Sequence, residues 1–193
     1  MNIENFAFLQ NINGDVDFVF ASKHNERLAA RCVADFIFTA LKNSNKKVFL
    51  FTGNQKSSLH LNAKNAFLEK CEQYKMSVAG AFDMFDDDSV LKANVNLIGE
   101  DVGAVYITSG NSLSLCEYVK NQRKDIVLVC TDTYEELNAY LSDGTIALTV
   151  DQNISGQAYK ALYGIAMYII KGQKPEKIHY TDFKFTTKSM LEE

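Results

Sequence analysis

The chain has 193 residues, enough for one good-sized domain or two small subdomains, and its hydrophobic fraction of 47% is that of a protein with a core. The net charge of −4 argues against free nucleic acid as a partner, and no apolar run approaches the roughly 20 residues of a membrane-spanning helix. The opening MNIENFAFLQ lacks the basic and apolar regions of a signal peptide. The cysteines form no C-x-x-C pair, which favours buried reduced thiols in a cytoplasmic protein. They are Cys32, Cys71, Cys116 and Cys130.

Strand and helix patterns alternate along the chain. The predicted strands are 6–10, 17–22, 46–53, 76–84, 103–109, 125–131, 145–150 and 177–187, with a turn at INGD between the first two. The predicted helices are 25–42, 58–74, 86–98, 112–122, 134–141 and 156–171, the last closed by Gly172. Strands this apolar, each followed by a helix, predict a three-layer α/β/α fold with a mainly parallel sheet covered on both faces.

The stretch VFLFTGNQKSSLHLNA has the outline of a phosphate-binding loop, but its spacing excludes one. Only two residues separate Gly53 from Lys56, and no second glycine precedes the lysine. The three histidines stand apart from one another and from the cysteines, so a zinc site is not expected. The acidic run DMFDDD is better explained as the capped start of a helix than as a metal site. We therefore expect no catalytic residues, no metal and no cofactor, and hence no enzyme.

Polar residues follow several apolar strands at the points where those strands end. In a parallel sheet the carboxyl ends share one edge, so we expect these side chains to lie together there. Carboxylates, amides and hydroxyls are the groups that hold a small polyhydroxylated ligand. The candidate ligand-binding residues are Asn54, Ser109, Asn111, Asp132 and Gln152.

Two of these candidates also have a purely structural interpretation. Asp132 precedes a capping box formed by Thr133 and Glu136, where it would only favour the start of a helix. Gln152 would be an ordinary turn residue. The residue types and positions alone leave both interpretations open.

A series of loose motifs occurs in a specific order in the second half of the chain. The first motif is a strand with the pattern Val-x-x-Asp. It is followed by G-x-(I/V), which opens a second apolar strand, and by a Gln after that strand. A Gly then begins a long helix, which ends in G-x-x-P. Here these are Val129–Asp132, Gly144–Val150, Gln152, Gly156 and Gly172–Pro175. With the upstream helix ERLAARCVADFI, this order resembles the effector-binding domain of LacI-family transcription regulators, from about residue 18 onward. The ribose-binding type of periplasmic protein looks to share the same fold.

The resemblance implies which residues bind ligand. Asp132 and Gln152 match two ligand-binding positions of the family, and Ser109 matches a third that is usually Asn or Asp. Three departures thin the polar shell. Ala63 stands where the family has a ligand-binding arginine, Ala21-Ser22 stand where an Asp-Asn pair is common, and Glu26 replaces a glycine.

The resemblance also implies a periplasmic-binding-protein-like type I fold in two subdomains. Residues 1–43 and 153–176 would be a remnant of the N-terminal subdomain, and 44–152 and 177–193 the C-terminal effector-binding subdomain. The DNA-binding headpiece and most of the N-terminal subdomain would be missing, so that the chain would be the C-terminal part of a longer regulator. Apolar faces on helices 25–42 and 156–171 would then need a cover, either a second copy or the two short N-terminal strands.

The expected function is effector sensing by a LacI-type regulator in the cytoplasm, with a small molecule, a carbohydrate, as ligand. The regulator would be a homodimer that contacts DNA only through the missing headpiece, and no membrane partner is expected. The alternative is a sugar-binding subunit of an ABC transporter or a sensor ectodomain. A helix-turn-helix encoded upstream would favour the regulator, and a signal peptide the alternative.

Overall fold

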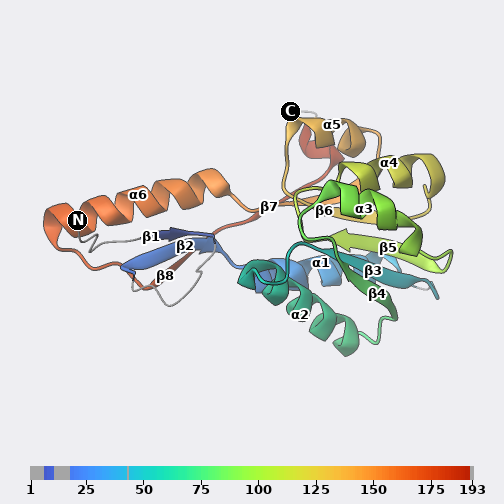
Figure 1. Cartoon of the computed structure of the whole chain (residues 1–193), viewed down its shortest axis with the longest axis horizontal. Coiled ribbons are helices and arrows are strands. Elements are labelled where there is room, and N and C mark those ends of the chain that lie inside the picture. The colour runs from blue at the N-terminus through green and yellow to red at the C-terminus, as the bar shows by residue number, and fades with distance from the viewer. Residues whose placement is uncertain (1–6, 11–17, 43, 192–193) are drawn as a thin grey trace.

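The computed structural model describes residues 7–10, 18–42 and 44–191, and in it the chain forms two separate sheets (Figure 1). We call the six-stranded sheet with its five helices the large body, and the three-stranded sheet with its single long helix the small body. The predicted INGD turn, Phe6 and Asp17 lie outside the described residues.

The large sheet is parallel except at one edge. Its strands, in order across the sheet, are β4 (Val78–Asp83), β3 (Lys47–Thr52), β5 (Val102–Ile107), β6 (Val127–Thr131), β7 (Ile146–Asp151) and β9 (Lys184–Thr186). Only β9 runs antiparallel to its neighbour. The predicted mainly parallel sheet is therefore confirmed.

Helices cover both faces of the large sheet. One face is covered by α1 (Glu26–Ala40) and α2 (Ser58–Gln73), and the other by α3 (Asp88–Asn94), η1 (Val95–Leu97), α4 (Leu113–Gln122) and α5 (Glu135–Ser142). Because successive strand residues point to opposite faces, Val48 and Leu50 join the core under α1 and α2, while Phe49 and Phe51 join the other core. The predicted three-layer α/β/α architecture is confirmed.

The position of α1 differs from the sequence prediction. Its buried residues, Ala29, Ala30, Val33, Ala34 and Ile37, belong to the same core as α2 and the large sheet. Leu28, near the start of the same helix, is 49% exposed. The small alanine side chains allow α1 to pack closely on α2, so α1 belongs to the large body, and the assignment of residues 25–42 to the N-terminal subdomain is wrong.

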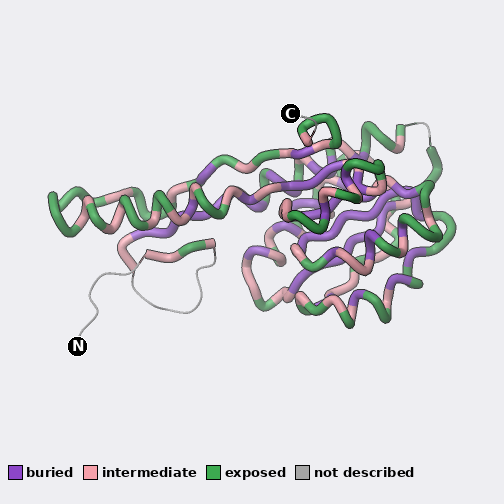
Figure 2. The backbone as a smooth tube through the Cα atoms, turned by 90° about the horizontal axis from the view of Figure 1, so that it is seen from above, coloured by how far each residue is buried: buried purple, intermediate pink, exposed green. Residues whose placement is uncertain are grey.

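The small body contains three parallel strands in the order β1 (Ala7–Leu9), β2 (Phe20–His24) and β8 (Ile178–Thr181). The central strand β2 is buried along its whole length, whereas α6 (Ile154–Lys171), which lies along this sheet, is mostly exposed (Figure 2). As predicted, Gly172 ends α6: its φ is +66°, and its N–H donates to the carbonyl of Tyr168 at 3.0 Å.

The C-terminal segment expected as one strand, 177–187, forms two strands in different sheets. β8 pairs with β2 in the small body, and β9 pairs with β7 in the large body. The chain therefore crosses between the bodies after Thr181 and not near Lys177. The short helix η2 (Lys188–Leu191) then contacts α5.

None of the described helices is both long enough and apolar enough to cross a membrane.

Candidate functional site

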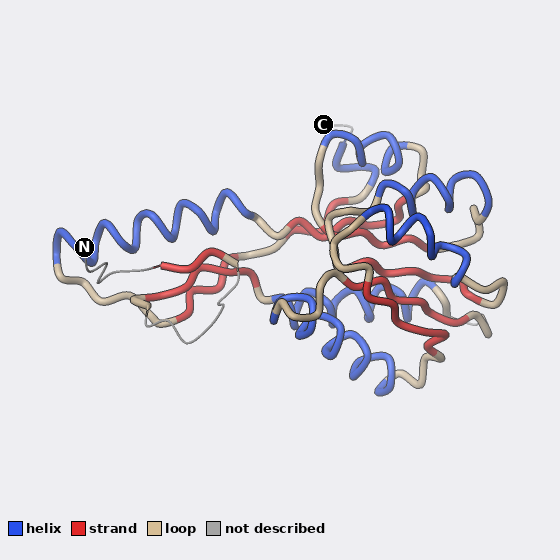
Figure 3. The backbone as a smooth tube through the Cα atoms, in the orientation of Figure 1, coloured by secondary structure: helices blue, strands red, loops and turns tan. Residues whose placement is uncertain are grey.

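The parallel strands of both sheets end at the junction between the two bodies (Figure 3). β2 ends at His24 and leads directly into α1 of the large body. β7 ends at Asp151 and leads into α6 of the small body, and β8 ends at Thr181 just before the crossing to β9. Because ligands of open α/β folds bind beyond the carboxyl ends of the strands, this junction is the candidate site.

Asp132 and Gln152 are in direct contact at this edge. Gln152 Nε2 donates a hydrogen bond of 2.8 Å to Asp132 Oδ1. The amide of Gln152 is buried, and its Oε1 has no hydrogen-bond partner within the described part of the chain. The backbones of the two strand ends are hydrogen-bonded as well, since the Asp132 N–H donates to the carbonyl of Val150 at 2.8 Å. The two strongest sequence candidates thus form one acceptor-rich pair.

The environment of Asp132 disfavours its charged form. Burial raises the pKa of the Asp132 carboxyl above its ordinary value, the hydrogen bond from Gln152 opposes this increase, and the Asp151 carboxylate adds to it. No ion pair links Asp132 or Asp151 to a cation among the described residues. A ligand that donates hydrogen bonds would satisfy these acceptors.

Ser109 and Gly110 lie beside the Asp132 carboxylate. A Cβ atom added to Gly110 would come within 2.9 Å of Asp132 Oδ2, so only glycine permits this approach of backbone to carboxylate. Ser109 is buried at the end of β5, where its Oγ accepts a hydrogen bond of 3.3 Å from the N–H of Asn111. The structure therefore places Ser109 near the Asp132–Gln152 pair, with its hydroxyl turned toward its own loop.

Asn54 and Asn111 are held by a different residue, Asp86. The N–H of Asn54 donates to Asp86 Oδ2 at 3.0 Å, and Asn111 Nδ2 donates to the Asp86 carbonyl at 2.5 Å. Both asparagines thus organise the loop between β4 and α3. Their hydrogen bonds go to Asp86, whereas Asp132 is bonded to Gln152, so the five candidates fall into two groups.

His60 is a site residue that the sequence analysis missed. Its Nδ1 lies 3.0 Å from Thr108 Oγ1, and its Nε2 lies 3.3 Å from Asp86 Oδ1. Burial lowers the pKa of His60, and the Asp86 carboxylate opposes that shift. The only sequence signal is its position in the first turn of α2, just after the strand end at Gly53.

The crossing from β2 to α1 is polar and buried. Lys23 Nζ donates to Glu26 Oε1 at 2.8 Å, and Asn62 Nδ2 donates to the same oxygen at 2.9 Å. His24 lies beside them, and burial lowers its pKa to about 4. Several buried atoms at the junction have no hydrogen-bond partner among the described residues: Ser22 Oγ, His24 Nδ1, Glu26 Oε2, Gln152 Oε1, Gln157 Oε1 and Thr181 Oγ1.

Left-handed backbone conformations are concentrated at this edge. Asp132 has a φ of +67°, Asn153 of +54°, and the consecutive residues Phe85 and Asp86 of +57° and +59°. Such conformations cost free energy in residues other than glycine and cluster at sites where function requires a particular geometry. Four of the six described non-glycine residues with positive φ therefore lie at this edge.

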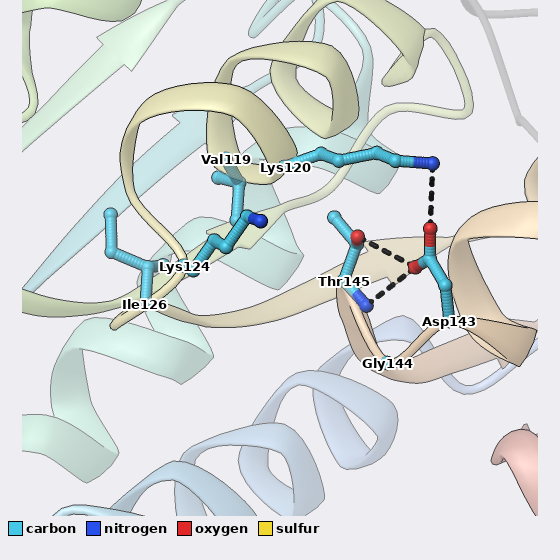
Figure 4. A pocket seen from close by; sticks show the side chains of 7 residues that line it. All are labelled: Val119, Lys120, Lys124, Ile126, Asp143, Gly144 and Thr145. Carbon is cyan, nitrogen blue, oxygen red and sulfur yellow. Dashed lines mark hydrogen bonds and ion pairs between the residues drawn. The ribbon is translucent and has the colours of Figure 1, made fainter.

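A hollow of about 410 Å³ opens beside Asp132 and Asp151, and the start of α6 forms its other wall. A second hollow, of about 290 Å³, lies at the opposite edge of the large sheet, before the first residues of β6 and β7 (Figure 4). There Lys120 and Thr145 already bond the Asp143 carboxylate, at 2.7 Å each from Nζ and Oγ1. The unpartnered Gln152 Oε1 belongs to a separate, much smaller gap of about 10 Å³, which Gln152 lines together with His24 and Glu26.

Two structural interpretations of the sequence are settled by contacts. The capping box at Thr133 is wrong, because Thr133 Oγ1 lies 2.9 Å from Thr149 Oγ1 and no side chain caps α5. The acids of the DMFDDD run do serve as caps: Asp87 Oδ1 accepts from the N–H of Ser89 at 2.8 Å. Ala63, at the family's arginine position, lies on the buried face of α2 and belongs to the core that this helix shares with α1 and the sheet.

A model of the family described as "Periplasmic binding protein domain" matches residues 10–174. The chain belongs to this family. A comparison with curated protein sequences found no match.

Solved structures of similar fold come from the same class of protein. A glucose-galactose binding protein from Geobacillus stearothermophilus superposes with a TM-score of 0.87 at 21% identity, over 96% of this chain and 68% of that one. A periplasmic ribose ABC transporter protein from Conexibacter woesei superposes with a TM-score of 0.81 at 21% identity, and the match covers 95% of this chain and 65% of that one. An arabinose binding protein from Geobacillus stearothermophilus has a TM-score of 0.84 at 18% identity, and the match covers 96% of this chain and 69% of that one. This periplasmic binding protein domain therefore spans about two thirds of the length of these neighbours.

Proposed function

We propose that this periplasmic binding protein domain holds a small sugar at the junction of its two bodies, as a solute-binding protein does. The observation that carries the proposal is the Asp132–Gln152 pair, which sits at the carboxyl edge with a free acceptor on Gln152. Sugar hydroxyls supply the donors that such acceptors need. The names of the structural neighbours, which refer to glucose-galactose, ribose and arabinose, support a carbohydrate ligand.

The chain's three crossings suit a protein that closes on its ligand. The crossings lie at 24–26, 151–154 and 181–184, between the strands of one body and the elements of the other. A ligand that contacts both bodies stabilises the closed arrangement, and only such differential contact can shift the equilibrium between open and closed forms.

Isothermal titration calorimetry with D-glucose, D-galactose, D-ribose and L-arabinose tests this function. We expect at least one of these sugars to bind, and Asp132→Ala to weaken its affinity about 10- to 100-fold, because hydrogen bonds to charged groups are the stronger ones. Asp143→Ala is the matched control, because its carboxylate lies at the opposite edge of the large sheet. Failure of all four sugars to bind, or full affinity of the Asp132 variant, would contradict the proposal.

The second candidate is the effector-binding domain of a LacI-type regulator, which the order of the sequence motifs favours. The structural neighbours are named as sugar-binding and transport proteins, and this supports the solute-binding function instead. Both functions use the same ligand site. A mobility-shift assay of the full-length gene product, with and without the bound sugar, separates them, because only the regulator releases or binds DNA in response.

A further inference from the structure

The helix α6 is apolar on two opposite sides, and only one of them is covered. The covered side carries Gln157, which is fully buried, and Gly164, which faces β2: a Cβ atom added to Gly164 would come 2.4 Å from the Phe20 ring. The other side carries large apolar residues one to three positions apart on a helical face. We call this row, Tyr159, Leu162, Tyr163, Ala166, Ile169 and Ile170, the α6 stripe.

The α6 stripe is exposed to an extent that is unusual for its residue types. Leu162 is 74% exposed and Ile170 is 76% exposed, and all six members are exposed residues. Figure 2 shows the exposed positions recurring along the whole helix. A helix that is hydrophobic all round is normally buried, and a contiguous apolar patch of this kind usually marks an interaction site.

The docking of α6 on the small sheet fixes the direction in which the stripe points. The close contact at Gly164 leaves no room for a rotation that would bring a larger side chain against Phe20. The stripe therefore cannot turn inward, and covering it requires another surface.

We propose that the α6 stripe is the interface of a homodimer in which the stripes of two copies pack together. The five large side chains leave about 550 Å² exposed, if each offers on the order of 150–200 Å² when free. Two copies would then bury about 1,100 Å² before any contact at the rim, close to the roughly 1,200 Å² at which specific interfaces begin.

The chemistry of the stripe suits pairing with itself. It contains no charged residue, because the two lysines of the helix, Lys160 and Lys171, lie on its other flanks. The two tyrosines stack with their ring centroids 5.9 Å apart and so present one flat aromatic surface. A two-fold axis through Ala166, the smallest member, would allow the two helices to approach closely there while the larger residues interdigitate on either side.

Sedimentation velocity of the full chain tests this interface. We expect the wild type to sediment as a dimer and the double variant Leu162→Glu/Ile170→Glu to sediment as a monomer with an unchanged circular dichroism spectrum. The matched control is Leu28→Glu/Leu61→Glu, which places the same charges on leucines of α1 and α2 that are 49% and 40% exposed, and it should remain a dimer. A monomeric wild type, which would leave the stripe for a different protein or for a lipid surface, overturns the proposal.

Disulfide cross-linking gives a second readout that does not depend on weakening the interface. Ala166→Cys should form a cross-linked dimer under mild oxidation, whereas Leu28→Cys should not. A dimer that persists in the Leu162→Glu/Ile170→Glu variant, or that does not cross-link through residue 166, would show that the interface lies elsewhere.

Discussion

Asp132 combines a half-buried carboxylate with a left-handed backbone, and both features cost stability. We expect Asp132→Asn to raise the free energy of unfolding at neutral pH by about 1 kcal/mol, as at other sites that trade stability for function. Asparagine keeps a partner for Gln152, tolerates the positive φ and removes the charge next to Asp151. Urea denaturation measures the gain, which should vanish under acid conditions, where Asp132 itself is neutral.

The direction of the pKa shift of Asp132 determines how the free energy of unfolding changes with pH. Because its pKa is raised in the folded protein, the stability linked to this group is greatest below its unfolded pKa and is lost as pH rises through the folded pKa. Sugar affinity should change in the opposite sense and fall as acid neutralises the carboxylate. A binding affinity that does not change from neutral pH into the acid range would rule out an ionised Asp132 as the acceptor.

His24 provides a second pH dependence with the reverse sign. Its pKa is about 4 in the folded protein and 6.5 when unperturbed, so its stability contribution is present above pH 6.5 and is lost as pH falls toward 4. The shift in the pKa of His24 corresponds to a loss of up to about 3 kcal/mol in the free energy of unfolding. We expect His24→Asn to flatten the loss of stability measured by urea denaturation between these two pH values. His179→Asn, on the neighbouring strand β8, is the control and should leave the slope in place.

At the scale of elements, the attachment of α6 to the small sheet depends on Gly164. We expect Gly164→Val to lower the free energy of unfolding by about 2 kcal/mol, because the new side chain meets the Phe20 ring. Lys160→Val, at an exposed position of the same helix outside the stripe, should cost less than about 1 kcal/mol, since only helix propensity changes. Thermal unfolding compares the two, and equal losses would show that the Gly164 contact is unimportant.

The elements differ in how well their sequences predict them. In α2, predicted over 58–74, apolar residues at every fourth position form the buried face: Leu59, Ala63, Phe67 and Cys71. In α1 the buried face is mostly alanine, which a search for large apolar residues misses. The break between β8 and β9 has no local signal, since it arises from pairing with strands far away in the chain.

In the candidate site, too, the sequence predicts positions along the chain better than it predicts contacts between distant residues. Asp132 and Gln152 were predicted to lie together because each follows an apolar strand, and they do make direct contact. The link from His60 to Thr108 joins residues 48 positions apart through side chains, and no pattern in the sequence specifies it. Strand ends can therefore be predicted from the sequence, whereas the contacts among them come from packing.

At the scale of the whole molecule, Lys23, Glu26 and Asn62 tie the crossing strand of the small body to α2. We expect Glu26→Ala to cost about 3–5 kcal/mol, because it leaves the Lys23 ammonium buried without a partner. The double variant Lys23→Met/Glu26→Leu should lose much less, since no buried charge then remains. Glu69→Ala, which removes an exposed pair with Arg27, should cost under about 1 kcal/mol. If urea denaturation showed equal losses for the single and double variants, an unpaired Lys23 charge would not be the cause of the instability.

The pairing of β2 with β8 has a consequence for how the chain folds. Ala21 pairs with Ile178, so the small sheet joins segments from nearly opposite parts of the sequence, whereas β3 to β7 follow one another along the chain. Closing so long a loop is entropically costly until the intervening chain is ordered. During synthesis, β2 must therefore wait, unpaired with β8, until the ribosome has released Ile178–Thr181. The strands β3 to β7 of the large body can therefore assemble first, and the small sheet and the edge strand β9 are completed last. A chaperone that shields β2 in the meantime would act on its most apolar residues, Phe20 and Ala21.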